Sequence, residues 1–181
     1  MFGTLFKRKV SEEKLVVYFI NSTIEMVDNG FGDVAELINQ DPCFVESPNI
    51  QPNQSDQFLL IVLAGNIKLI SNHFESIQDR RILNKAYNVL SHTFDLPADE
   101  VQKLISNYQS YISKVNFPSK NTLYGMSKAV FYKYGLNDFQ EPYFKNMKAP
   151  NPLFIKRLDS IIEKFIWDWT EFQEKYKIVE R

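Results

Sequence analysis

The chain has 181 residues, of which 44% are hydrophobic and 24% are charged, and its formal net charge is −1. This composition is typical of one globular domain and excludes collagen-like, low-complexity and disulfide-rich chains. No stretch reaches the roughly 20 apolar residues that cross a bilayer.

The only thiol, Cys43, has no second cysteine with which to form a disulfide. No apolar export signal follows the basic residues at positions 7–9. We therefore expect a cytoplasmic protein. Since no His or Lys lies near Cys43 in the sequence, ordinary thiol reactivity is also expected.

Residues 1–10 are expected to form a flexible basic tail ahead of the folded domain. Phe2, Leu5 and Phe6 precede the bases at positions 7–9, a mixture found in segments that rest on anionic membranes. Three charges with little apolar area give only marginal attachment, so membrane contact is the less favoured alternative. We expect instead that the phenylalanines fold back onto the domain.

Two helices and a long loop are predicted next. Ser11 is a suitable N-cap for the first helix, and Asn29-Gly30 is typical of a helix end. A short second helix is predicted over residues 33–39. The loop at 41–55 contains three prolines, and loops of this length are either functional lids or mobile. We favour a disordered segment or a passive surface wrap.

Residues 57–74 are predicted to form a buried helix. The first part, FLLIVLAG, is almost entirely apolar, and helical spacing resumes after it at Ile67 and Ile70. Gly65 leaves room for the close approach of a neighbouring element. We expect this helix to pack against the C-terminal helix in the core.

Three further helical patterns follow. They cover residues 79–93, residues 98–115, and a segment that starts after Ser119 as N-cap and closes at Gly135. The stretch at 136–150 is predicted to be a connector with one helical turn.

Residues 151–176 are predicted to form one long amphipathic helix. Asn151 is a good N-cap, and Pro152 suits the first helical position. In such a helix Trp167 lies about 200° from the apolar stripe, on the polar side. It is either an exposed anchor for a partner or packs beneath the long loop or a neighbouring helix. The stripe itself consists of Leu158, Ile161, Phe165, Trp169, Phe172 and Tyr176.

These patterns predict an all-α fold. The chain is expected to form a single-domain irregular bundle of six or seven helices with a long C-terminal helix. The flexible basic tail covers residues 1–10 and the single helical domain covers 11–181. Helices 57–74 and 151–176 are expected at the centre of the core.

Charge is unevenly distributed along the chain. Residues 15–67 contain seven acidic and no basic residues, whereas residues 101–137 contain five lysines and no acidic residue. The two blocks either face each other in the fold, are simply solvated, or mark a surface for a charged partner. The residues proposed to bind a partner are Lys103, Lys114, Lys120, Tyr124, Lys128, Lys133 and Trp167.

No catalytic, metal-binding or cofactor-binding set can be recognised. His73 and His92 fall on separate predicted helices, and one cysteine with two histidines cannot build a Cys/His zinc cluster. The six glycines form neither a phosphate-binding loop nor a dinucleotide fingerprint. The sequence therefore favours a protein without enzymatic activity, although a triad assembled from distant positions leaves the question open.

We expect a non-enzymatic interaction module, an adaptor or accessory subunit, that binds another protein through charge-segregated and aromatic surfaces. An acidic partner suits the lysines. Nucleic acid is disfavoured, because the block contains no Arg to read base edges. The alternative is a small-molecule binder or hydrolytic enzyme whose inter-helix pocket is closed by the 41–55 loop. The oligomeric state is left open.

Overall fold

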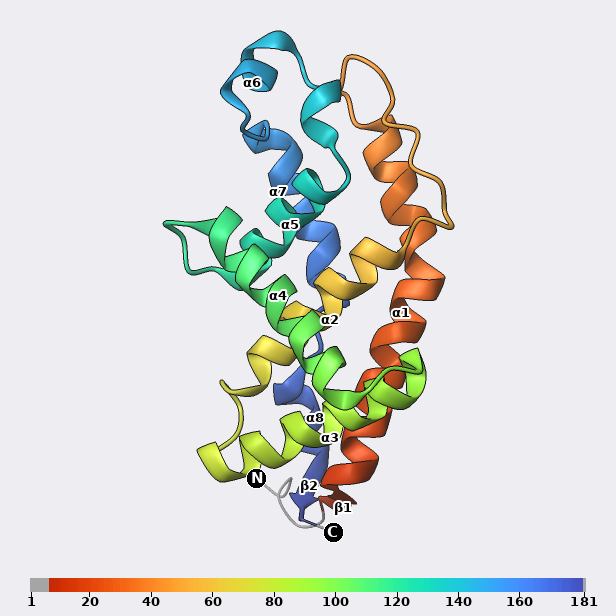
Figure 1. The fold of residues 1–181 in the computed structure, drawn as a ribbon, viewed down its shortest axis with the longest axis vertical. Coiled ribbons are helices and arrows are strands. Elements are labelled where there is room, and N and C mark those ends of the chain that lie inside the picture. Colours follow the sequence, from red (N-terminus) through yellow and green to blue (C-terminus); the bar gives the residue numbers. More distant parts are fainter. Residues whose placement is uncertain (1–6, 181) are drawn as a thin grey trace, which may run out of the picture.

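A computed structural model describes residues 7–180, which form an elongated all-α bundle (Figure 1). Among these residues, seven α-helices have seven or more residues, which confirms the predicted fold class and helix number. The α-helices are α1 (Glu12–Gln40), α2 (Asp56–Ile70), α3 (Ser76–Phe94), α4 (Ala98–Asn116), α5 (Thr122–Lys133), the short α6 (Pro142–Met147), α7 (Pro152–Ile162) and α8 (Trp169–Lys175). The remaining elements are the 3₁₀ helices η1 (Leu136–Phe139) and η2 (Glu163–Phe165) and the strands β1 (Arg8–Ser11) and β2 (Tyr176–Val179).

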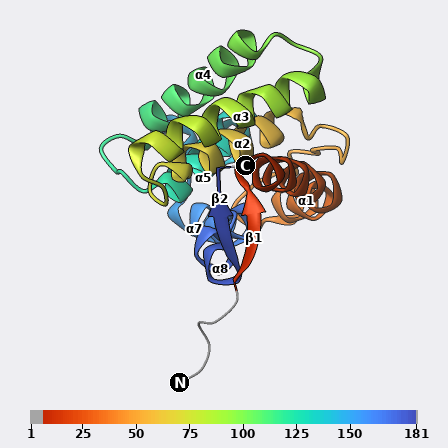
Figure 2. The same ribbon diagram turned by 90° about the horizontal axis from the view of Figure 1, so that it is seen from below.

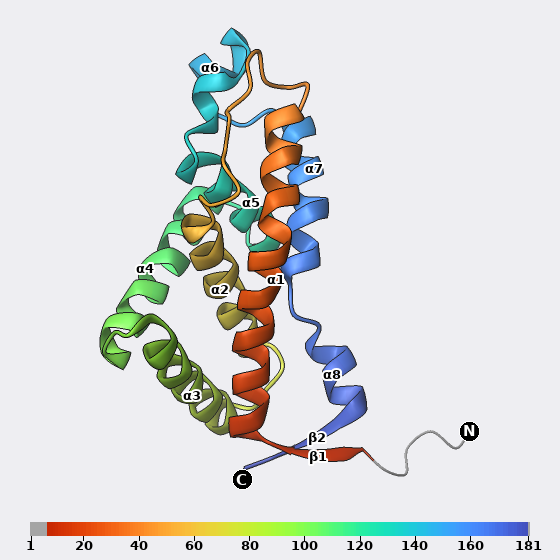
Figure 3. The same cartoon turned by 90° about the vertical axis from the view of Figure 1, so that its right-hand side faces the viewer.

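The core lies around α2, which is buried on nearly all sides. Helices α2 and α5 lie between α4 on one side and α1 with α7 on the other (Figure 3). At Gly65 an added Cβ would overlap the side chain of Met126 from α5, so this glycine allows the close approach that the sequence predicts. Helix α2 packs mainly on α4 and α5, and it meets the predicted C-terminal segment only around Phe165, whose ring centroid lies 5.0 Å from that of Phe58.

The first helix does not end at Asn29-Gly30, and the prediction of two helices is wrong. Helix α1 runs without a break from Glu12 to Gln40, with Ser11 as its N-cap. Gly30 is present for packing, because an added Cβ would lie 2.9 Å from Cζ of Phe165. The next residue, Phe31, is buried against Phe58, with ring centroids 5.4 Å apart. Tertiary packing therefore overrides the local helix-end signal.

The predicted long C-terminal helix is broken, which is a second correction. Helix α7 ends at Ile162, the chain is extended at Ile166, and Asp168 caps a new helix, α8. The fully buried side chain of Asn66 in α2 fills the break. Its amide donates to the carbonyl oxygen of Phe165 (2.8 Å) and accepts from the backbone N–H of Trp167 (2.7 Å). Two backbone groups freed by the break are thereby satisfied.

The two ends of the described chain meet in a small parallel sheet (Figure 2). Arg8 of β1 pairs with Tyr176 of β2, and Ser11 pairs with Val179. Residues 8–10, predicted to belong to the flexible tail, are therefore part of a strand, whereas residues 1–6 lie outside the described residues. Beside the sheet, the buried carboxylate of Glu12 accepts two-point hydrogen bonds from Arg81 of α3.

The 41–55 loop wraps the end of the bundle and is fixed by side chains. The amide group of Asn39 donates to the carbonyl oxygen of Ile50 and accepts from its N–H, both at 2.8 Å. The ring of Phe44 packs against Phe154 of α7. The hydroxyl of Tyr134 donates to the carbonyl oxygen of Gln54 at 2.6 Å. These contacts agree with a surface wrap and not with disorder.

Smaller differences concern helix ends. Helix α2 stops at Ile70, four residues before the predicted end, and α3 begins at Ser76. Asn121, not Ser119, caps α5 by accepting from the N–H of Tyr124. Gly135 follows α5 with a φ of 65°, the left-handed conformation expected of a C-terminal glycine.

Candidate functional site

The strongest candidate site is an open groove of about 290 Å³ between the first half of α1 and α8. One wall comes from α1, and the other comes from the α7–α8 connection, α8 and the start of β2 (Figure 3). We call it the aromatic groove. Its lining residues are Tyr18, Met26, Ile166, Trp167, Asp168, Glu171, Phe172, Lys175 and Tyr176.

Four aromatic rings form the floor and sides of the groove. Tyr18 meets Trp167 edge-on with ring centroids 5.4 Å apart, and Trp167 lies 5.9 Å from Phe172. Phe172 in turn stacks on Tyr176 at 4.6 Å. Tyr18 is 58% exposed, so a large amphipathic side chain faces solvent in the middle of this cluster. Rings of this kind dominate the energetics of protein interfaces.

The groove exists because the C-terminal helix is broken. Trp169 begins α8 and is buried in the core against Phe19, with ring centroids 4.9 Å apart. The extended backbone between Ile166 and Asp168 turns Trp167 toward α1 instead of away from it. The predicted polar-side position of Trp167 assumed a continuous helix and is therefore wrong. Its side chain is half-buried and packs on a neighbouring helix, the second of the two expected outcomes.

Trp167 has a buried indole N–H without a hydrogen-bond acceptor among the described residues. The same is true of Trp169, but only Trp167 lines the groove. A buried donor that has lost its water partner without gaining another is energetically costly, typically by about 1–3 kcal/mol.

A charged rim surrounds the aromatic floor. Glu171 and Lys175 form an ion pair one helical turn apart on α8. Asp168 caps the helix by accepting from the N–H of Glu171 at 2.8 Å. An apolar centre with a polar rim is the usual anatomy of a protein-binding surface.

The predicted lysine residues lie elsewhere, on α4, on α5 and in the turn between them, and we call this the lysine face. Lys103, Lys114 and Lys120 are exposed. Lys128 is half-buried, with its Nζ 4.7 Å from the ring centroid of Tyr124, one turn earlier on α5. The structure therefore brings Lys128 to Tyr124 and places the other lysines on α4, on α5 and in the turn between them, whereas Trp167 lies in the aromatic groove.

Lys133 completes the lysine face and lies over two rings of α4. Its Nζ is 4.9 Å from the ring centroid of Tyr108 and 4.6 Å from that of Tyr111. Burial raises the pKa of both phenols above the ordinary value, so both rings stay neutral at physiological pH. Cation–π contacts of this kind fix the position of the ammonium group without neutralising its charge.

Intramolecular ion pairs do not account for the charge segregation. The acidic residues Glu25, Asp28, Asp33 and Glu36 are exposed on α1, across α2 from α4 (Figure 3). Within residues 7–180, none of the ion pairs joins one of these four to the lysine face.

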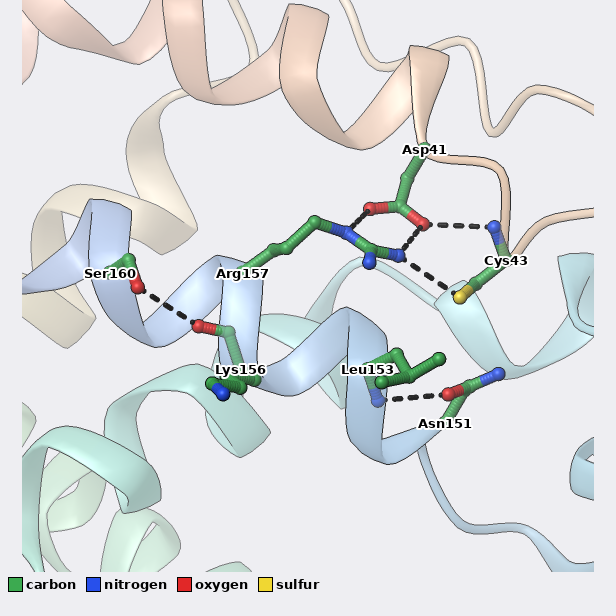
Figure 4. A network of polar contacts seen from close by, with 7 residues as sticks. All are labelled: Asp41, Cys43, Asn151, Leu153, Lys156, Arg157 and Ser160. Carbon is green, nitrogen blue, oxygen red and sulfur yellow. Dashed lines mark hydrogen bonds and ion pairs between the residues drawn. The ribbon is translucent and has the colours of Figure 1, made fainter.

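A second polar cluster fixes the 41–55 loop to α7 (Figure 4). Nε and Nη2 of Arg157 donate to the two carboxylate oxygens of Asp41 at 2.7 Å each. Nη2 also lies 3.1 Å from Sγ of Cys43, whose backbone N–H donates to Asp41. Nothing in the sequence indicates this cluster, because 116 residues separate Asp41 from Arg157.

The pKa values of this cluster indicate a structural role. Burial alone would raise the pKa of Asp41, but the hydrogen bonds from Arg157 and Cys43 outweigh it and hold that pKa below the ordinary value. Burial raises the pKa of the Cys43 thiol, which is the opposite of what a nucleophilic cysteine requires.

The described residues offer little for the enzymatic alternative. No group of three or more His, Cys, Asp or Glu side chains within residues 7–180 could hold a metal ion. Ser127 donates a hydrogen bond to Asp159, whose pKa is raised by burial, but no histidine completes a triad there. The 41–55 loop lines none of the five surface hollows that we describe in this part of the chain. Within the same residues, no helix has the length and apolar character to cross a membrane.

Fold and groove together define a class of protein: a helical bundle that presents an open aromatic groove. Comparison with protein-family models, with curated proteins and with solved structures gave no match.

Proposed function

We propose that this protein is a non-enzymatic interaction module, an adaptor or accessory subunit, that binds a segment of another protein in the aromatic groove. The observation that carries the proposal is the exposed ring of Tyr18, which stands against Trp167 and Phe172 at a junction of α1 and α8. Exposed aromatic clusters with charged rims are typical of binding surfaces.

The openness of the groove favours a side-chain anchor over a metabolite. Pockets for drug-sized ligands are enclosed and usually hold about 300–1,000 Å³. The aromatic groove has about 290 Å³ and is open to solvent along its length. One or two apolar side chains of a partner segment fit such a site, and the rim of Asp168, Glu171 and Lys175 provides polar contacts around them.

The lysine face is proposed as a second contact surface for an acidic region of the partner. Its charge is unopposed by any ion pair to α1 among the described residues. Nucleic acid is a weaker proposal, because the face contains lysine and no arginine. The cytoplasm is the proposed setting, where a free thiol such as Cys43 is normal.

Matched tyrosine variants test the proposal. The full chain, Tyr18→Ala and Tyr143→Ala are used to capture partners from the cells that make the protein, at moderate salt. Tyr143 is 66% exposed but lies on α6, far from the groove. A captured protein that is lost with Tyr18→Ala and kept with Tyr143→Ala supports groove binding. A partner set that is the same for both variants contradicts it.

A charge-reversed variant separates the two surfaces. Lys120→Glu, Lys128→Glu and Lys133→Glu together reverse the lysine face and leave the aromatic groove intact. If the lysine face binds the acidic region of the same partner, the affinity falls and its dependence on salt concentration becomes weaker. An unchanged affinity and salt dependence would remove the lysine face from the proposal.

A further inference from the structure

We propose that the chain covers its own aromatic groove: residues 1–6, with the sequence MFGTLF, fold back into it and compete with the partner segment. This inference rests on the groove of the proposed function and adds a regulatory occupant to it. The argument uses the point where the described chain begins, the length of the segment and its chemistry.

The segment joins the structure at the edge of the groove. Arg8, the first residue of β1, pairs with Tyr176, which lines the groove. The Nζ of Lys7 donates to the carbonyl oxygen of Gln173 on α8 at 2.7 Å. Val10 of β1 lines a hollow that shares Tyr18 and Phe172 with the groove. Figures 2 and 3 show β1 entering the fold next to α8.

The segment is long enough to fill the groove. Six extended residues span at most about 20 Å. Helix α8, which forms one wall of the groove, has seven residues and is therefore about 10 Å long. A chain that starts beside Tyr176 thus reaches Trp167 at the other end of α8 with length to spare.

The chemistry of the segment matches that of the groove. Phe2, Leu5 and Phe6 are spaced at i, i+3 and i+4, so that one turn can present all three on a single face. They are large apolar side chains for an aromatic floor, and the segment carries no acidic residue. Because the segment is tethered at β1, it meets the groove at a high effective concentration.

Nuclear magnetic resonance of the indole N–H groups tests the proposal. The chain has two tryptophans, so a ¹⁵N-labelled sample gives two indole signals, which Trp167→Phe assigns. We compare the full chain with the triple variant Phe2→Ser, Leu5→Ser and Phe6→Ser, and use Thr4→Ala as the matched control. In the triple variant the Trp167 signal is expected to shift and its hydrogen exchange to accelerate at least tenfold. The Trp169 signal should stay in place, and Thr4→Ala should resemble the unaltered chain.

Two additions make the outcome decisive. A synthetic peptide MFGTLFKRKV added to the triple variant should restore the original Trp167 signal, whereas a scrambled peptide should not. Identical Trp167 signals in the full chain and the triple variant overturn the proposal. So does a difference that requires anionic lipid vesicles, because the segment then binds membrane. Either result leaves the Tyr18→Ala capture test, and hence the proposed function, unaffected.

Discussion

Asn66 is expected to hold the chain break between α7 and α8, and its replacement by leucine tests this role. The change removes the amide that donates to Phe165 and accepts from Trp167, while side-chain volume changes little. Two backbone groups then lose their partners. At about 1–3 kcal/mol for each unsatisfied group, the loss is about 2–6 kcal/mol. The leucine recovers about 2 kcal/mol through apolar burial. The expected net loss in the free energy of unfolding is therefore about 0–4 kcal/mol, with a midpoint of about 2 kcal/mol.

Urea unfolding followed by tryptophan fluorescence and by circular dichroism measures this loss, because both indoles lie next to the break. Asn72→Leu is the matched control. That asparagine is exposed just after α2, and its replacement should change stability by less than about 0.5 kcal/mol. If Asn66→Leu were more stable than the unaltered chain, or if its helical signal rose, the break would not depend on this amide.

Two further predictions concern close packing and the Asp41 cluster. Gly65→Ala should lower the free energy of unfolding by about 1–2 kcal/mol, because overpacking against Met126 exceeds the gain in helix propensity. Gly32→Ala, with nothing within 4 Å of the added Cβ, should raise the free energy of unfolding by about 0.5–1 kcal/mol. Urea unfolding of both variants measures the two changes, and equal effects would refute the packing argument. The pKa of Asp41 is lowered in the folded state, so the stability that Asp41 contributes is complete above its unfolded pKa and is lost as pH falls through its folded pKa. Arg157→Met should therefore weaken the fall in the free energy of unfolding that is measured between about pH 5 and 2. An unchanged dependence on pH would contradict this.

Local patterns predicted the helices well where the core stripe is regular. The pattern at 98–115 matches α4, and the all-round apolar stretch that starts at Phe58 matches α2. Gly30 shows the limit of such patterns. Asn29-Gly30 favours a helix end when only the local sequence is considered, but in the fold Gly30 lies inside α1, where its missing side chain makes room for Phe165 of η2. No local window contains that information.

The break in the C-terminal helix could not be predicted for the same reason. The side chain that fills it, Asn66, lies 99 residues from Phe165 in the sequence. The pairing of β1 with β2 was missed because each strand has four residues, too few for a periodic pattern.

The candidate site was predicted in part. The sequence drew attention to Trp167 and to the lysines, and the structure places the Nζ of Lys128 over the ring of Tyr124. The partners of Trp167 were not predictable. Tyr18 lies 149 positions earlier in the chain, and only the turn of the backbone at Ile166 brings the two rings together.

The parallel sheet has a consequence for biosynthesis. β1 leaves the ribosome before its partner β2, which follows 168 residues later, since Arg8 pairs with Tyr176. During translation the backbone groups of β1 must therefore wait without their strand partner until the intervening helices and β2 have been made. A nascent chain stalled before Tyr176 would therefore present an open strand edge to chaperones.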